Sequence, residues 1–180
     1  FGVCNHFSFA SPGRPDLMLI HPEGYFWDEV IASCIVLATH DGTIISTNGN
    51  TVELTAFCIH APIHRLLPQA TAVLQTHMHH ATAICTRKGG TVAPVYLSGM
   101  SFYNGIAYDR GFTGAAVTPA EGERLAGVIG TSTVLMMDNH GPLVIGATRG
   151  QALLRLIYLE DTCKIQRLGG AGGADLQPIA

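Results

Sequence analysis

The sequence predicts an α/β domain, because short apolar runs typical of strands alternate along its 180 residues with longer runs of helical periodicity. Turn-forming residues separate these runs, as at Asp41-Gly42. Two capping patterns, Thr118-Pro-Ala-Glu121 and Thr148-Arg-Gly-Gln151, mark helix starts. We expect one domain over residues 1–168, preceded by a missing N-terminal portion and followed by a flexible glycine-rich tail over 169–180.

Apolar spacing assigns the individual elements. Strands are expected over 6–9, 17–20, 35–39, 43–46, 72–76, 131–137 and 142–145, with the fourth joined to the third by the Asp41-Gly42 turn. Helices are expected over 52–67, 81–86, 118–129 and 148–168, with a short helical turn around 28–33. Pro62 falls inside the first long helix, where we expect it to kink the helix or tighten one turn.

Composition limits the classes of function. Hydrophobic residues make up 47% and charged residues 13% of the chain, where an ordinary soluble domain has about 25% charged residues. We therefore expect part of the surface to be buried in a homo-oligomer, the alternative being a monomer whose surface is rich in glycine, alanine and threonine. A net charge of −3 without a basic run argues against nucleic acid as the partner, and no apolar stretch reaches a membrane span.

The five cysteines are scattered and form no CxxC pair, so neither a disulfide framework nor a thiolate zinc site is indicated. A reducing cytoplasm is the simplest location. The sequence also contains no nucleophile elbow, phosphate-binding P-loop or dinucleotide fingerprint. Chemistry must therefore come from other residues.

Histidine is the residue type that most suggests chemistry. His77 follows the strand expected over 72–76, and His140 lies in the turn between two later strands. Neutral imidazole is a common ligand of zinc, iron and manganese, so the two residues form half of a metal site if they converge. The alternative is that each satisfies a local hydrogen bond. His79 shares a face with His77 only if the segment is extended, and this geometry fails if a helix begins at Met78.

Other polar residues admit simpler explanations. His60 and His64 are four apart on a helix, but we favour a packing or surface role for them. Glu53 lies at a helix start, where the helix dipole favours a carboxylate. Glu160 and Asp161 are expected on the solvated face of the last helix.

Three segments resemble the class II aldolase/adducin family. Residues 72–83 resemble its strand that ends in H-x-H and leads into an A-T-A helix; 55–64 resemble the preceding helix; and 134–141 resemble its N-H-G segment. The resemblance implies a mostly antiparallel sheet between helices, tetramers with sites at subunit boundaries, and a divalent metal held by histidines. The family includes aldolases, epimerases, decarboxylases, an oxygenase branch and adducin, which binds the cytoskeleton.

By this resemblance His77 and His140 match metal ligands, whereas Gln75 replaces the first histidine of H-x-H and Ala56 replaces an acidic ligand. Either the site is rebuilt, with His79 or Gln75 completing it, or it is lost. His6 stands where sugar-phosphate enzymes carry asparagine. We therefore expect His6 and Ser8 to bind a substrate without phosphate.

The resemblance favours a lyase that uses zinc, manganese or iron to stabilise an enolate of a small oxo or aromatic acid. Tyr103, Tyr108 and Glu53 are its candidate catalytic residues. The alternatives are a non-catalytic, adducin-like binding or scaffold domain and a non-heme iron oxygenase that uses the same pocket.

Overall fold

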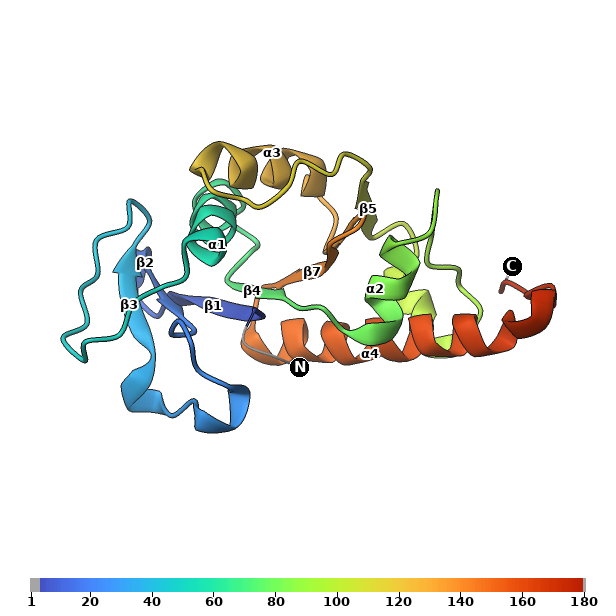
Figure 1. Ribbon diagram of the computed structural model, residues 1–180, viewed down its shortest axis with the longest axis horizontal. Helices are drawn as coiled ribbons and strands as arrows, with labels where there is room; N and C mark the ends of the chain where they lie inside the picture. Colours follow the sequence, from blue (N-terminus) through green and yellow to red (C-terminus); the bar gives the residue numbers. More distant parts are fainter. Residues whose placement is uncertain (1–3, 180) are drawn as a thin grey trace.

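A seven-stranded mixed sheet forms the centre of the computed structural model, which describes residues 4–179 (Figure 1). Its order is β3-β2-β1-β4-β7-β6-β5. The strands are β1 (His6–Ser11), β2 (Arg14–Ile20), β3 (Val36–Thr39), β4 (Ala72–Gln75), β5 (Ile106–Asp109), β6 (Val134–Met137) and β7 (Gly141–Gly146). Strands β5 and β6 run parallel, and all the other neighbours in the sheet are antiparallel, which confirms the expected fold class.

Helices cover both faces of the sheet. The helices α1 (Leu54–Leu66) and α3 (Pro119–Ile129) pack together on one side, and α2 (His79–Cys85) and α4 (Arg149–Gly169) on the other (Figure 1). Four short 3-10 segments complete the description: η1 (Trp27–Glu29), η2 (Ala32–Cys34), η3 (Leu97–Phe102) and η4 (Ala171–Gly173). No helix of the described residues is long and apolar enough to cross a membrane.

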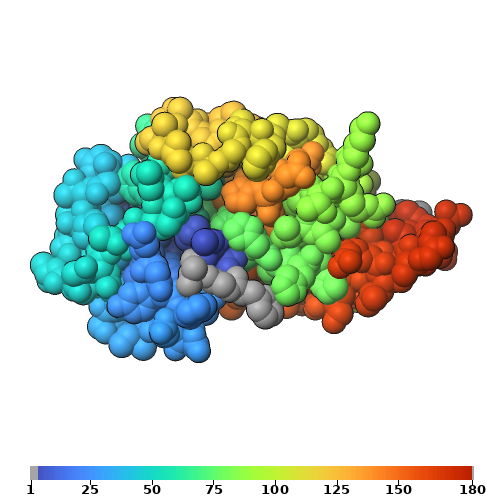
Figure 2. All heavy atoms as spheres, viewed as in Figure 1, coloured from blue at the N-terminus to red at the C-terminus, as the bar shows by residue number. Residues whose placement is uncertain are grey.

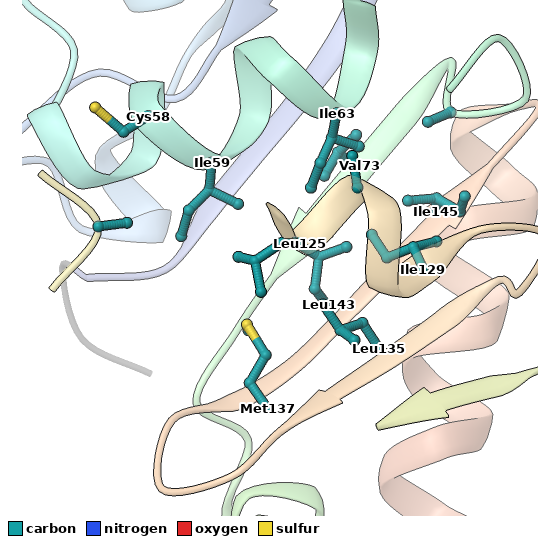
Figure 3. Packing of buried hydrophobic residues seen from close by; sticks show 13 residues of the cluster. Cys58, Ile59, Ile63, Val73, Leu125, Ile129, Leu135, Met137, Leu143 and Ile145 are labelled. Atoms are coloured by element: carbon teal, nitrogen blue, oxygen red, sulfur yellow. The ribbon is translucent and has the colours of Figure 1, made fainter. Parts of the chain in front are cut away.

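Alternation along the strands divides the core into two layers. On β4, Val73 packs with the α1/α3 layer, whereas Leu74 packs with the α2/α4 layer. Figure 3 shows Ile59 and Ile63 of α1 and the apolar side chains of α3 gathered against the sheet. By the same alternation Gln75, two residues after Val73, faces the α1 side, and its β1 partner in register is His6. The end of β4 therefore presents polar residues beneath α1.

Of the two expected capping patterns, the one at Thr148 is confirmed and the one at Thr118 is wrong, and Glu53, which was expected only at a helix start, also forms a cap. The Glu53 carboxylate caps α1 by accepting the Ala56 N–H at 2.8 Å, and the Thr148 hydroxyl caps α4 by accepting the Gln151 N–H at 3.1 Å. Thr118 precedes α3 but makes no side-chain cap bond. The carboxylate of Glu121, which the capping box needs, binds Arg124 and the hydroxyl of Thr113 instead.

Pro62 lies inside α1 without ending it, since the helix continues to Leu66. The adjoining helix α3 approaches very closely here: a Cβ atom on Gly122 would lie 2.1 Å from the Cys58 carbonyl oxygen. Glycine at this position therefore sets the spacing of the two helices.

The sequence analysis missed β5 and η3 and expected a strand over 43–46. Strand β5 has four residues, of which three are half-buried at the sheet edge, so it lacks a strong apolar signal. In place of a strand over 43–46, one bridge joins Ala38 to Ile44. After α4 the chain turns back, and the Ile179 N–H donates to the Pro94 carbonyl at 2.8 Å.

Truncating the sheet core tests this packing. Leu143 on β7 is completely buried in the α1/α3 layer, so we expect Leu143→Ala to lower the free energy of unfolding by about 2–5 kcal/mol. Leu97→Ala is the matched control, because Leu97 on η3 is 79% exposed and its loss should cost less than about 0.5 kcal/mol. Urea unfolding measures both values, and equal losses would contradict the assigned layers.

Candidate metal and substrate site

Two imidazoles meet at one end of the central strands. His77 follows β4 and His140 directly precedes β7, and their ring centroids lie 5.3 Å apart at an interplanar angle of 29°. The β6–β7 turn comes close enough because residue 141 is glycine: a Cβ there would lie 2.7 Å from the Thr76 carbonyl oxygen and 3.3 Å from the His77 ring. The convergence that the sequence suggested is therefore present.

Backbone bonds hold both histidines in place. The His77 N–H donates to Oδ1 of Asn5 at 2.7 Å, and the Asn139 N–H donates to the Cys85 carbonyl at 3.1 Å, which fastens the β6–β7 turn to α2. Burial lowers the pKa of His77, and burial followed by the neighbouring His77 lowers the pKa of His140. Both rings are therefore neutral near pH 7 and carry a lone pair.

Gln75 lies between the two rings. Its side chain is buried, and Nε2 is 3.2 Å from Nε2 of His77 and 3.4 Å from Nε2 of His140. Among residues 4–179, no three His, Cys, Asp or Glu side chains come together as a metal-binding group. The donor set is therefore two imidazole nitrogens and one amide, which fits a divalent ion only when the amide oxygen faces the rings.

His79 does not join this set. Met78 is the N-cap of α2 and His79 its first residue, so the extended geometry required for an H-x-H pair is absent at this position, and His79 is exposed. The expectation that His79 completes a three-histidine group is therefore wrong in this structure. The helix that begins after Met78 is the physical reason.

Glu160 has a role that sequence reasoning missed. Its two carboxylate oxygens accept the N–H groups of His80 and Ala81 at 3.0 and 2.9 Å. The carboxylate thus caps the first turn of α2 from α4, where the sequence suggested a solvated face. A contact between residues 80 positions apart leaves no local pattern that could have revealed it.

A buried hydrogen-bond chain lies beneath α1. The Ser8 hydroxyl oxygen is 2.6 Å from Nδ1 of His60 and 2.7 Å from Nε2 of His64, and Nδ1 of His64 is 2.7 Å from the Ala70 carbonyl oxygen. A carbonyl only accepts, so in neutral His64 Nδ1 carries the hydrogen and Nε2 accepts from Ser8. Ser8 then accepts from Nδ1–H of His60. The buried Ser8 hydroxyl thus donates to His64 and accepts from His60, and it orients both rings. Its expected contact with a substrate stays a prediction.

His6 and Glu53 are close to this chain. His6 is edge-on to His60 with ring centroids 6.1 Å apart, and its Nε2 is 3.6 Å from the Glu53 carboxylate. Both ring nitrogens of His6 and Nε2 of His60 are buried without a hydrogen-bond partner among the described residues. Burial lowers the pKa of His6 to about 4, although Glu53 acts in the opposite direction. Two of the predicted site residues, His6 and Glu53, are thus neighbours.

The two candidate tyrosines lie elsewhere in this chain. Tyr103 and Tyr108 line a cavity of about 240 Å³ beside β5, together with Phe102 and Asn104. Tyr103 is 66% exposed, while the Tyr108 hydroxyl accepts the Val92 N–H at 3.1 Å. This cavity is not lined by His77 or His140. The structure therefore brings together the histidines and Glu53 but not the tyrosines.

The buried imidazoles predict a stability that depends on pH. Burial lowers the pKa values of His6 and His64 from 6.5 to about 4. In the unfolded chain these rings bind protons below pH 6.5, whereas in the folded protein they stay neutral to about pH 4. The free energy of unfolding should therefore fall between pH 6.5 and pH 4, by up to about 3 kcal/mol for each residue.

Denaturant unfolding at a series of pH values measures this loss. His64→Gln removes one titrating ring while keeping a polar group toward Ser8, so its unfolding free energy should depend less steeply on pH, whatever its value at pH 7. An unchanged slope would contradict the assignment.

Comparison with known proteins agrees with this geometry. The chain superposes on the crystal structure of an aldolase II superfamily protein from Pseudomonas syringae with a TM-score of 0.91 and 32% identity, covering 100% of this chain and 73% of that one. A 4-hydroxy-3-prenylphenylpyruvate oxygenase/4-hydroxy-3-prenylbenzoate synthase of Streptomyces roseochromogenus is 25% identical over 98% of this chain and 64% of its own length. Human beta-adducin is 28% identical over 89% of this chain and 22% of its own.

The bacterial curated relatives that match are longer proteins, since the chain spans 63–66% of their length. The family model for the Class II Aldolase and Adducin N-terminal domain matches residues 1–167. The sequence resemblance is thereby confirmed, and the chain belongs to the class II aldolase/adducin family.

Proposed function

We propose that this domain is a metal-dependent carbon–carbon lyase, of aldolase or decarboxylase type, that acts on a small non-phosphorylated oxo or aromatic acid. The observation that carries the proposal is the convergence of two neutral imidazoles, His77 and His140, on one buried amide. Neutral imidazoles held 5.3 Å apart between ring centres suit a shared cation. The Streptomyces relative, whose name includes an aromatic oxo acid, supports this class of substrate.

Zinc, manganese or iron would be held by His77, His140 and the oxygen of Gln75. When bound, such an ion supplies Lewis-acid stabilisation of the enolate that forms as the carbon bond breaks. Gln75 is buried at the strand ends beneath α1 and is therefore kept away from water. Electrostatic interactions are stronger where water is excluded. His6, beside Gln75 in the sheet register, would donate its ring N–H to an oxygen of the substrate.

Glu53 is suited to accept a proton rather than to supply one. Its Oε2 accepts hydrogen bonds from the Thr55 hydroxyl at 2.5 Å and the Ala56 N–H at 2.8 Å. Although burial acts to raise it, the pKa of Glu53 is lowered by these bonds, so the group is a carboxylate near pH 7. Tyr103 and Tyr108 remain candidates for proton transfer across a subunit boundary, since their cavity lies apart from the histidine pair within one chain.

A non-catalytic, adducin-like role is the second candidate, favoured by one observation: the described residues lack a group of three strong metal ligands. An iron-dependent oxygenase that uses the same pocket is the third, and the name of the Streptomyces relative supports it. Metal binding separates the first and third from the second. Dependence on oxygen separates the first from the third.

Metal titration tests the proposal. We expect the purified protein to bind Zn²⁺, Mn²⁺ or Fe²⁺ at one site per chain, and His77→Ala or His140→Ala to weaken binding at least about tenfold. His79→Ala is the matched control, because that exposed ring lies outside the donor set and should leave affinity unchanged.

Turnover of non-phosphorylated oxo acids and aromatic oxo acids should then follow metal loading and continue without oxygen. Absence of metal binding would leave the scaffold role, and turnover only in the presence of oxygen would favour the oxygenase.

We further propose that the chain forms a homo-oligomer, a tetramer by family resemblance, in the cytoplasm. The outward side of α4 carries five exposed apolar residues, with Asp161 and Lys164 among them. The five are Leu153, Leu154, Ile157, Ile165 and Leu168, which are exposed by 38–64%. Figure 2 shows the C-terminal part of the chain, with the last turns of α4, standing out from the rest of the molecule. All five cysteines are free, and four of them are buried, which supports a reducing location.

Charging this side of α4 tests the assembly. Ile157→Asp should shift the protein toward monomers in sedimentation velocity, because a buried unpaired charge disrupts an apolar interface. Ile31→Asp, at a residue that is 63% exposed elsewhere on the surface, serves as the control and should leave the assembly intact. A wild-type protein that sediments as a monomer at all concentrations would contradict the proposal.

A further inference from the structure

We infer that Gln75 is a built-in plug of the histidine pair: its amide NH2 group fills the point where a cation would bind, and the amide must turn over before a cation can enter. The inference rests on the proposed metal site but concerns this chain's own hydrogen bonds. The site would then alternate between a closed form, in which Gln75 is hydrogen-bonded to the two rings, and an open form, in which the amide has turned. Three observations lead to it.

The first is the hydrogen count on His77. The amide nitrogen of Gln75 lies 3.2 Å from Nε2 of His77. An amide NH2 group can donate but cannot accept, so Nε2 of His77 must be the acceptor. A neutral imidazole has a single N–H, so the hydrogen of His77 is then on Nδ1. Gln75 therefore presents its NH2 group to His77 rather than its oxygen.

The second is the match in number. A primary amide carries two hydrogens, and the same Nε2 of Gln75 lies 3.2 Å from His77 Nε2 and 3.4 Å from His140 Nε2. One hydrogen therefore serves each ring. The amide nitrogen thus lies between the two ring lone pairs, where a cation shared by the rings would bind. Its hydrogens satisfy the same two acceptors that would coordinate the cation.

The third is an acceptor that is ready for the turned amide. His6 pairs in register with Gln75 across β1 and β4. Its ring nitrogens make no hydrogen bond of normal geometry within residues 4–179, but the Gln75 side chain is near enough to act on the pKa of His6 by hydrogen bonding and to raise it. When the amide turns so that its oxygen faces the two rings, its NH2 group can donate to His6. Because the two ends of an amide are nearly equal in size, the buried Gln75 can turn in place without displacing its neighbours. The NH2 group thus has an acceptor in either orientation, and in the turned one the amide oxygen is directed at the position of a shared cation.

Replacing the amide by a carboxylate tests the plug. Gln75→Glu has the same length, carries no hydrogen to donate at neutral pH and offers oxygen in both orientations, so we expect its affinity for Zn²⁺ to exceed that of wild type by about 100-fold. Gln69→Glu is the matched control, since it adds the same charge at an exposed position bonded to the Gly130 carbonyl and should leave the affinity unchanged. Titration calorimetry measures the affinities, and thermal unfolding confirms that each variant is folded.

A second readout follows the amide itself in the wild-type protein. Without metal, the Gln75 side-chain NH2 should give protected NMR signals that are shifted by the two rings, and the Nε2 atoms of His77 and His140 should have the nitrogen shifts of acceptors. Addition of Zn²⁺ should move the Gln75 amide signals to a new position. Unchanged amide signals in a zinc-bound protein would overturn the plug.

The two proposals fail in different ways. Zinc binding by Gln75→Glu but not by wild type would support the plug and contradict the proposed metal-dependent function of the natural protein. Equal zinc affinity of the two proteins would contradict the plug but not the proposed lyase function. Absence of binding by both would overturn the plug as well, because removing it would not have opened a site.

Discussion

Each buried imidazole of this domain has one hydrogen to donate and one lone pair to satisfy, and this constraint governs the site. Burial lowers the pKa values of His6, His60, His64, His77 and His140, so all five rings are neutral near pH 7. Each neutral ring must then find suitable partners around it. The Ala70 carbonyl determines the direction of the whole Ser8–His60–His64 chain, and the Gln75 NH2 group determines which nitrogen of His77 accepts.

The backbone makes this arrangement of rings geometrically accessible. Residue 141 must lack a side chain for the β6–β7 turn to lie against Thr76 and His77, and residue 122 must lack one for α3 to lie against α1. The approach at residue 122 sets the position of α3 against α1, and the approach at residue 141 sets the position of His140. A side chain at residue 141 would collide with the segment that carries His77, so glycine there allows His140 to lie beside Gln75.

Periodicity predicted most of the helices and strands, because long amphipathic segments such as α1 and α4 carry a strong local signal. It missed β5, in which three of the four residues are half-buried at the sheet edge. It also predicted a capping box at Thr118, where Thr118 makes no side-chain cap bond and the Glu121 carboxylate binds Arg124 instead. The pairing of His77 with His140 could be predicted from their places at strand ends. The roles of Ser8 and Glu160 could not, since each depends on partners more than 50 positions away.

By capping α2, the Glu160 carboxylate connects α4 with the segment that follows His77. A single carboxylate of α4 holds the first turn after the histidine loop, while leucine and isoleucine residues on an adjoining side of α4 are exposed. A shift of α4 would pull on the amides of His80 and Ala81 and hence on the segment that carries His77. The environment of α4 is therefore connected to the His77 segment through one acidic side chain.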